Sequence, residues 1–374
     1  MYIKYIWELP DWPRFRWDDS RLIEPLGLAH RKEGRLLGSM ARLGFDLKLS
    51  AEVEAITEEA IKSSEIEGEM LNRESVRSSV ARRLGVPEAA LVPEDRKVEG
   101  IVSITLDATK NYAEPLTRER LFGWHAALFP TGYSGLRRIK VGGWREDMNG
   151  PMQVVSGRIG KEKVHYQAPP AERVEAEMAA FLDWFEKPRT IDGILHAAIA
   201  HLWFVTIHPF DDGNGRIARA LADMSLARSE DTPQRFYSLA SEIRRERPDY
   251  YATLEQTQKG NLEITERLLW FVACLSHALD AAEDTCRDVL RKADFWQHHA
   301  LTPLNDRQRK VLNRFLDGFE GKLTAQKWTA LTKCSMATAQ RDIKDLMDRG
   351  LLARNEGGSK NSSYRIANHA EDEA

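Results

Sequence analysis

The sequence predicts an all-α body that carries one small β insertion and is followed by a separate C-terminal module. Apolar residues recur with helical periodicity along most of the 374 residues. Residues 132–170 break this pattern with seven glycines and short alternating apolar pieces. Near Leu301 both the pattern and the charge change again. At this length we expect two or three domains.

The N-terminal region, residues 1–112, is predicted to begin irregularly and then to become helical. Its first 45 residues or so open with several tryptophans and prolines, which is typical of an irregular packing segment. From Ser50, a good N-cap residue, apolar side chains recur on one face, and Gly68 is a residue at which such a helix ends. We therefore predict a helix over residues 50–68.

The central region, residues 113–290, is predicted to be a helical core around the glycine-rich insertion. Across both regions, helical patterns cover residues 74–84, 94–111, 117–128, 171–185, 190–207, a stretch from Gly215 onward, and 263–290. The insertion at 132–170 indicates one or two β-hairpins among these helices.

The C-terminal region, residues 301–368, is predicted to contain three helices and a glycine-tipped hairpin. This order resembles a winged helix-turn-helix domain, with residues 336–348 as its second, recognition-type helix. Residues 301–370 carry thirteen basic against seven acidic residues, whereas residues 1–300 carry 41 against 47. A basic module of this kind sometimes binds nucleic acid, although the predicted recognition helix is mixed in charge.

Composition favours a soluble cytoplasmic protein without a membrane partner. Hydrophobic residues make up 42% and charged residues 30% of the chain. No apolar run approaches the roughly 18 residues of a membrane span, and the first residues lack the pattern of a secretory signal. The three cysteines show no CxxC spacing, which indicates thiols in a reducing compartment.

Residues 208–219, with the sequence HPFDDGNGRIAR, carry the chemistry. Pro209 disfavours helical geometry at His208, so the apolar helix before it should end there. Gly213, Asn214 and Gly215 form a turn at the start of the next helix. Such a turn binds anions, because its backbone N–H groups and the helix dipole both point at the ligand.

Four side chains around this turn supply the rest of a phosphoryl or nucleotidyl transfer site. Asp212 can hold a divalent cation, which favours phosphates as the ligand. Arg216 and Arg219 share one helix face and can reach the same anion. His208 is a base with an ordinary pKa near neutrality. Taken singly, each of these residues could also belong to an ordinary surface loop.

Together these residues match HPFxxGNGR, the signature of Fic-domain proteins, and continue to its trailing arginine, Arg219. The segment from Ser63 to Gly68 resembles the inhibitory motif of the same family, which makes Glu67 the inhibitory glutamate and Arg219 its partner. The resemblance also implies a hairpin flap that lines up the target and two tyrosines that border an adenine pocket. The flap candidates are Val164, Tyr166, Gln167 and Ala168, and the tyrosines are Tyr250 and Tyr251.

The resemblance implies a protein adenylyltransferase that transfers AMP from ATP to a Ser, Thr or Tyr hydroxyl. In that family His208 would deprotonate the hydroxyl and Asp212 would hold Mg²⁺, with Mn²⁺ as a substitute. The turn's backbone amides and the Asn214 side chain would cradle phosphate oxygens. Arg216 would bind a phosphate, and Arg219 would hold the γ-phosphate unless Glu67 occupies it first. We expect a protein substrate, self-modification and a homodimer.

Two alternatives belong to other classes of function. The first is a DNA-binding regulator whose Fic core senses or modifies its own C-terminal module. The second is a de-AMPylating enzyme in which Glu67 helps to hydrolyse AMP from modified proteins.

Overall fold

The chain divides into two units, Met1–Glu283 and Asp284–Ala374. The computed structural model describes residues 5–86, 95–147, 150–157, 161, 163–316, 322–355 and 362–367. The boundary between the units falls within the long helix α11 (Thr265–His298). The three regions that the sequence predicts, residues 1–112, 113–290 and 301–368, remain a prediction.

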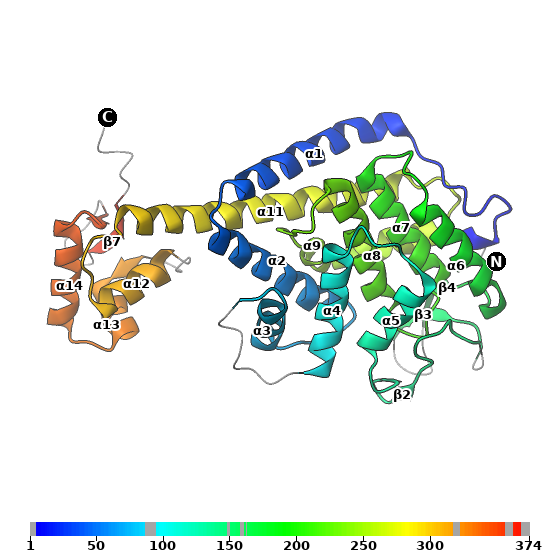
Figure 1. Ribbon diagram of the computed structural model, residues 1–374, viewed down its shortest axis with the longest axis horizontal. Helices are drawn as coiled ribbons and strands as arrows, with labels where there is room; N and C mark the ends of the chain where they lie inside the picture. The colour runs from blue at the N-terminus through cyan, green and yellow to red at the C-terminus, as the bar shows by residue number, and fades with distance from the viewer. Residues whose placement is uncertain are drawn as a thin grey trace. The chain divides into compact units, whose positions relative to one another are not determined.

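The first unit is helical, as the sequence predicts (Figure 1). Its elements, with the first part of α11, are η1 (Ile6–Glu8), α1 (Asp19–Ala41), α2 (Phe45–Ile66), α3 (Arg73–Arg83), α4 (Arg96–Lys110), α5 (Arg118–Leu128), β1 (Tyr133–Ser134), β2 (Arg137–Arg138), β3 (Gln153–Ser156), β4 (Lys163–Gln167), α6 (Ala171–Glu186), α7 (Gly193–Ile207), α8 (Asn214–Glu230), α9 (Leu239–Arg245) and α10 (Arg247–Gln258).

Helices α7 and α8 form the centre of this unit and frame the loop of residues 208–213. The Asp192 side chain caps α7 by accepting a hydrogen bond from the Ile194 N–H, and every residue from Ile194 to Ile207 is buried. The helix ends where the sequence predicts: His208 adopts left-handed φ and ψ angles of 52° and 58°, and Pro209 follows it. Gly213 then turns the chain into α8.

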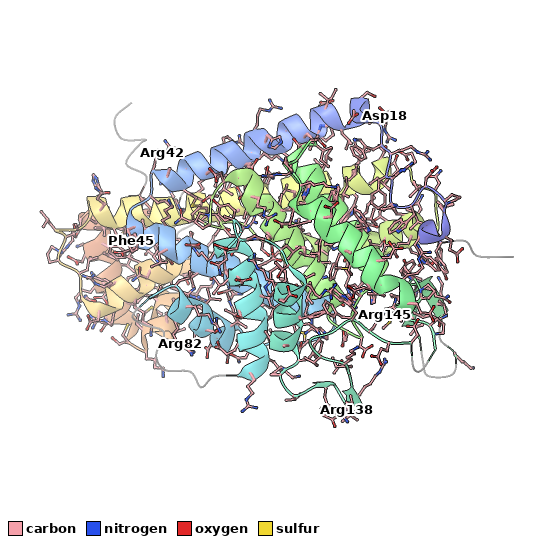
Figure 2. The ribbon with its side chains drawn as sticks, turned by 45° about the vertical axis from the view of Figure 1, so that its right-hand side comes forward. Asp18, Arg42, Phe45, Arg82, Arg138 and Arg145 are labelled. Carbon is pink, nitrogen blue, oxygen red and sulfur yellow. The ribbon has the colours of Figure 1, made fainter. Side chains whose placement is uncertain are left out.

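The prediction of an irregular first 45 residues is wrong, because α1 covers 23 of them. Asp18 and Arg42, which flank α1, are labelled in Figure 2. Leu22, Ala29, Leu36 and Met40 form a buried stripe along α1, which packing stabilises despite Pro25 in its second turn. Helix α2 likewise starts earlier than predicted, at Phe45 with Gly44 as its N-cap, so Ser50 lies inside it. It ends at Ile66, with Glu67 as C-cap and Gly68 at a φ of 84°.

The glycine-rich insertion forms two small antiparallel hairpins, β1–β2 and β3–β4, as the sequence predicts. In the second hairpin Val154 pairs with Tyr166 and Val155 with Val164, with an irregularity between Val154 and Val155. Among the described strands β3 pairs only with β4.

The second unit has its own hydrophobic core around Trp328, which is fully buried. Its elements beyond α11 are α12 (Asp306–Leu316), β5 (Leu323–Thr324), α13 (Ala325–Thr332), α14 (Met336–Asp348), β6 (Leu352–Arg354) and β7 (Ser363–Ile366), and the strands pair antiparallel in the order β5-β7-β6. Three helices and a hairpin thus occur in the order that the sequence predicts. None of the described helices in either unit is long and apolar enough to span a membrane.

Candidate active site

His208 follows the last turn of α7 and lines a cavity of about 500 Å³. Its Nδ1 lies 3.2 Å from the carbonyl oxygen of Val205, a contact that assigns the proton to Nδ1. The other ring nitrogen, Nε2, is then free to accept a proton. Burial lowers the pKa of His208 to about 4, so the imidazole is neutral near pH 7.

The turn before α8 requires a glycine at position 213. Gly213 has a φ of 82°, and a Cβ there would lie 2.9 Å from the ring of Phe129. Its conformation starts α8 at Asn214, and as a glycine it has no side chain to cap the N–H groups of the first helical turn. A glycine turn at a helix N-terminus can bind an anion, and this role of residues 213–215 stays a prediction.

The Asn214 side chain holds the loop itself, while its predicted role as a phosphate ligand stays a prediction. Its Oδ1 accepts a hydrogen bond from the Phe210 N–H at 2.9 Å, and its Nδ2 donates to the Phe210 carbonyl at 2.8 Å. The side chain is buried, and the backbone of Phe210 contacts both its Oδ1 and its Nδ2. Asn214 therefore contributes its backbone N–H to the turn and its side chain to the loop's shape.

Arg219 is buried and contacts two residues of the predicted inhibitory motif. Its Nε donates to the Ser63 hydroxyl at 2.8 Å, and its Nη2 donates to the Ser63 carbonyl at 2.7 Å and to Glu67 Oε1 at 2.8 Å. Within the described chain its Nη1 is buried without a hydrogen-bond partner. A buried guanidinium N–H in this state can donate to an anion.

Arg216 contacts a second glutamate that the sequence analysis missed. Its Nη1 lies 2.7 Å from Glu69 Oε2, and its guanidinium covers the ring of Phe129. Glu69 also pairs with Lys97 at 3.1 Å. The segment after α2 thus places one carboxylate on each arginine of the site. The Glu-x-Glu spacing is the sequence signal that could have indicated it.

Glu67 lies directly over the start of α8. A Cβ on Gly215 would come within 2.1 Å of Glu67 Oε1, so only glycine leaves room for the carboxylate. Glu67 lines the cavity of about 500 Å³ that contains His208, and it also lines a second cavity of about 950 Å³ that contains Asp212 and Arg216. The glutamate therefore stands where the two cavities meet.

Asp212 is partly exposed beside the turn. Its Oδ1 accepts a hydrogen bond from the Gly213 N–H, and its Oδ2 accepts one from the Ser134 hydroxyl in β1. Arg216 Nη2 lies 4.0 Å from Oδ1. Asp212 thus presents carboxylate oxygens to the larger cavity, as a cation ligand must.

Both candidate adenine-pocket tyrosines line the smaller cavity. Tyr250 is buried in the core and its hydroxyl shares a hydrogen bond with His201 Nε2 at 3.1 Å. Tyr251 is 38% exposed, its hydroxyl donates to the Ile66 carbonyl, and Arg247 covers its ring. Tyr251 consequently ties α10 to the end of α2.

The four predicted flap residues differ in burial, and their role in target docking stays a prediction. Tyr166 and Ala168 are buried with Tyr5 and Trp7, and the Tyr166 hydroxyl donates to the Thr206 carbonyl at 2.6 Å. Because these two side chains are buried, a docked target could contact Tyr166 and Ala168 only through their backbone. Val164 and Gln167 are partly exposed and remain candidates.

Comparisons with known proteins match two parts of the chain. Residues 115–226 match the model of the Fic/DOC family, and residues 5–86 match a domain of unknown function, DUF4172. The chain carries a Fic domain. The Fic match contains the whole segment 208–219, whereas Glu67 and Glu69 belong to the DUF4172 match.

The relatives agree with this assignment. The protein adenylyltransferase Fic of Nematostella vectensis is 36% identical over 137 residues, which are 35% of this chain and 30% of that protein. The protein adenylyltransferase fic-1 of Caenorhabditis elegans is 39% identical over 114 residues, or 29% of this chain and 21% of that protein. The matched segments thus span less than a third of these curated relatives. A crystal structure of a Fic family protein from Desulfovibrio desulfuricans G20 shares the fold, with a TM-score of 0.53, 20% identity, and coverage of 92% of this chain and 95% of that one.

Arg145 and His125, two residues of the Fic domain that were not predicted from the sequence, hold the loop by contacting its backbone carbonyls. Arg145, labelled in Figure 2, is buried and its Nε donates to the His208 carbonyl at 2.8 Å, while its Nη2 donates to the Pro169 carbonyl next to β4. His125 stacks on Phe210 with ring centroids 4.2 Å apart, and its Nε2 lies 3.2 Å from the Asp212 carbonyl. Burial lowers the pKa of His125 to about 4, so it acts as a neutral hydrogen-bonding group.

Proposed function

We propose that the protein transfers AMP from ATP to a hydroxyl group of a protein substrate. The observation that carries the proposal is the convergence of a neutral base, a glycine turn at a helix N-terminus, a carboxylate and two arginines on adjoining cavities. The relatives from Nematostella vectensis and Caenorhabditis elegans are named adenylyltransferases, which favours nucleotidyl transfer over other phosphate chemistry.

The chemistry of the two cavities suits the two ends of ATP. The smaller cavity has an apolar and aromatic lining that includes Val155, Leu254 and Tyr251, which fits a purine base. The larger cavity is lined by Lys97, Asp212 and Arg216, which fits a triphosphate and its cation. A nucleotide that spans both would bring its α-phosphate past Gly215, close to His208.

Each residue then has a role in transfer. His208 Nε2 would take the proton from the target hydroxyl as that oxygen attacks the α-phosphate and pyrophosphate leaves. The N–H groups of Asn214 and Gly215 would stabilise the charge that develops on the phosphate oxygens. Arg145 and His125 would position the loop without touching the substrate.

Asp212 would hold Mg²⁺. Carboxylate oxygens are the ligands that Mg²⁺ prefers, and this one is fixed by Gly213 and Ser134 beside the phosphate end of the proposed path. When bound, the cation would neutralise charge on the phosphates.

Label transfer tests the function directly. Protein incubated with ATP and a cell lysate, or alone, should acquire label from the α-phosphate and none from the γ-phosphate, because pyrophosphate leaves in AMP transfer. Transfer from labelled CTP, GTP and UTP, measured in parallel, tests which base the smaller cavity selects. Incorporation of γ-label would instead indicate a kinase, and no incorporation by the wild type or its Glu67→Gly variant would contradict the proposal.

Asp212→Asn should lose most of the transfer activity, and high Mg²⁺ or Mn²⁺ should restore only part of it, because the amide keeps the shape but lacks the charge that holds the cation. Asp211→Asn is the matched control: Asp211 accepts a hydrogen bond from the Lys140 N–H and lines neither of the two cavities. Initial rates across a metal titration measure both variants. Full activity of Asp212→Asn at low Mg²⁺ would remove Asp212 from metal binding.

We also propose that Glu67 and Glu69 inhibit the enzyme. Glu67 occupies Arg219 and the space over Gly215, and Glu69 occupies Arg216, so both arginines that would receive phosphates already have anionic partners. A nucleotide can reach across both cavities only if the Glu67 carboxylate moves.

A second candidate function, nucleic-acid binding by the C-terminal unit, gains support from the contacts of α14. The acidic residues that make this helix mixed in charge are largely engaged inside the unit: Asp342 is buried and pairs with Arg307 at 2.8 Å, and Asp345 accepts hydrogen bonds from Gln308 and Arg349. Arg341 and Lys344 remain exposed. The winged-helix interpretation remains part of this proposal.

Duplex DNA should therefore bind the full chain with a steep salt dependence, and Arg341→Ala with Lys344→Ala should weaken binding at low salt and make that slope shallower by about two phosphate contacts. A mobility-shift assay across salt concentrations measures this. Lys259→Ala, a change in α10 of the first unit, is the control for loss of one positive charge. Equal binding by the double variant and the wild type would exclude α14 as the contact.

A further inference from the structure

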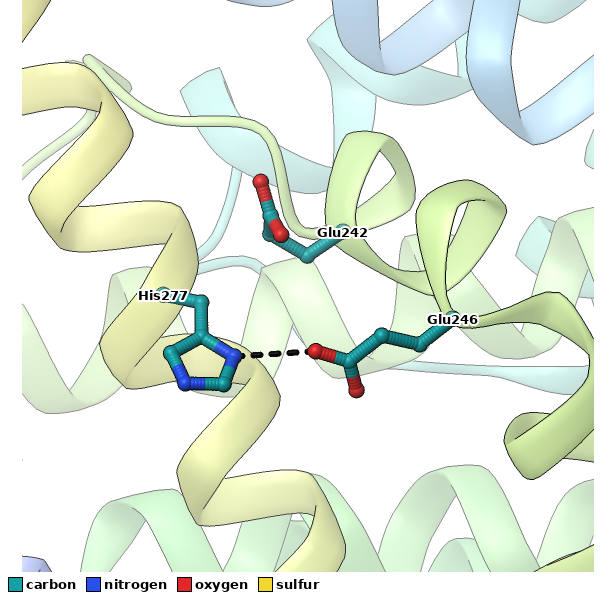
Figure 3. A group of neighbouring side chains, drawn as sticks. All are labelled: Glu242, Glu246 and His277. Carbon is teal, nitrogen blue, oxygen red and sulfur yellow. Dashed lines mark hydrogen bonds and ion pairs between the residues drawn. The ribbon is translucent and has the colours of Figure 1, made fainter.

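A second cluster of metal-ligating side chains lies outside the proposed active site. Glu242 belongs to α9, Glu246 stands at the junction of α9 and α10, and His277 belongs to α11 (Figure 3). One ligand atom from each residue lies within 4.8 Å of those of the other two. His277 Nδ1 and Glu246 Oε1 are 2.9 Å apart.

Glu242 is a buried carboxylate, and the ion pair described for it involves a mostly exposed side chain. The residue is only 3% exposed, and within the described chain its Oε2 has no hydrogen-bond partner. The nearest cation is Arg245, whose Nη1 lies 3.0 Å from that oxygen but whose side chain is 70% exposed. A buried carboxylate is costly unless a cation or hydrogen bonds satisfy it.

We propose that Glu242, Glu246 and His277 bind one divalent first-row transition metal ion, with Zn²⁺ as the representative. Two carboxylate oxygens and one imidazole nitrogen form a three-ligand set of the kind that Zn²⁺ accepts, with water in the fourth position. Imidazole disfavours Mg²⁺ and Ca²⁺, which prefer oxygen ligands. Ligand atoms of a tetrahedral zinc ion lie about 3.3 Å apart, given bonds of about 2.0–2.1 Å. The three ligand atoms lie within 4.8 Å of one another, so side-chain rotations that change their separations by about 1–2 Å would complete the site.

The ion would join the α9–α10 junction to α11. The start of α9 is already fixed to α2, because the Ser238 hydroxyl and the Ala240 N–H donate to Glu59 at 2.8 and 2.9 Å. The metal would therefore stabilise the side of the first unit against which α2 lies. This role does not depend on the proposed transfer activity.

A comparable group elsewhere on the same unit provides the control. His30 lies 2.9 Å from Glu33 and 2.7 Å from Asp192, but through its two different ring nitrogens. Its carboxylates therefore lie on opposite sides of the ring and cannot meet at one ion. His30→Ala removes a histidine with two acidic neighbours and leaves the proposed site intact.

Metal titration of chelator-treated full-length protein tests the proposal. Calorimetry should show one Zn²⁺ site whose affinity falls by at least about tenfold in His277→Ala and in Glu246→Gln, and stays unchanged in His30→Ala. Co²⁺ should give the visible bands of a nitrogen- and oxygen-ligated ion in the wild type and lose them in His277→Ala. Because His277 is half-exposed, its replacement should fold. Absence of a stoichiometric site, or equal Zn²⁺ affinity and Co²⁺ spectra in wild type and His277→Ala, would overturn the proposal.

Discussion

His208→Ala is expected to lower the rate of AMP transfer by about 10²–10⁴-fold, the usual contribution of a positioned general base. The reason is geometric: Nδ1 is held by the Val205 carbonyl, so Nε2 alone can accept the proton of the target hydroxyl. ATP binding should persist, because the phosphate contacts come from the turn of α8 and its arginines. Label transfer and nucleotide binding, measured on the same variant in the Glu67→Gly background, separate the two effects.

The pH dependence gives this prediction a second readout. A general base acts in its neutral form, and burial lowers the pKa of His208 to about 4 instead of its ordinary value near 6.5. Activity should therefore stay level as pH falls through 6.5 and decline only as it approaches 4, as far as the fold survives. A loss of activity centred near pH 6.5 would contradict the buried neutral imidazole, and near wild-type transfer by His208→Ala would remove His208 from the mechanism.

The parts of the site that could be predicted from the sequence are those fixed by neighbouring residues. Pro209 ends α7 at His208, and Gly213 starts α8, so the order of base, turn and arginines follows from local backbone preferences. The end of α2 just before Gly68 could be predicted for the same reason, because Gly68 adopts a positive φ of 84°.

The parts that could not be predicted depend on distant partners. Arg145 contacts the His208 carbonyl 63 positions away, and Arg216 contacts Glu69 147 positions away. Nothing local distinguishes these residues from surface charges. Helix α1 was missed for a related reason: its buried stripe is stabilised by packing, while the tryptophans and prolines before it suggested irregular structure. The burial of Tyr166 likewise depends on Tyr5 and Trp7 from the N-terminus.

Glu67→Gly is expected to raise AMP transfer by about 100-fold or more, visible first as self-modification. In the wild type the carboxylate pairs with Arg219 at 2.8 Å and fills the space over Gly215. ATP could then bind only with its α-phosphate displaced from His208, and a displacement of about 1 Å can cost roughly 100-fold in rate. Glu69→Gln should raise transfer less, since it frees Arg216 but leaves the path over Gly215 closed. Glu65→Gln is the matched control, because Glu65 pairs with Lys62 and Arg244 and contacts neither arginine of the site.

Replacement of Arg219 tests whether the higher rate of AMP transfer in Glu67→Gly comes from release of inhibition. Arg219→Ala should lower transfer whether or not Glu67 is present, because the γ-phosphate contact is lost in both cases. The double variant should therefore resemble Arg219→Ala and not the sum of the two single changes, a non-additive result that marks residues acting as a unit. The double-mutant cycle is measured as the rate of label incorporation at saturating ATP. Thermal melts confirm that each variant is folded. If Glu67→Gly folded, bound ATP and still transferred AMP no faster than wild type, inhibition by Glu67 would be refuted. If it also removed AMP from modified protein more slowly than wild type, Glu67 would instead serve the reverse, hydrolytic reaction.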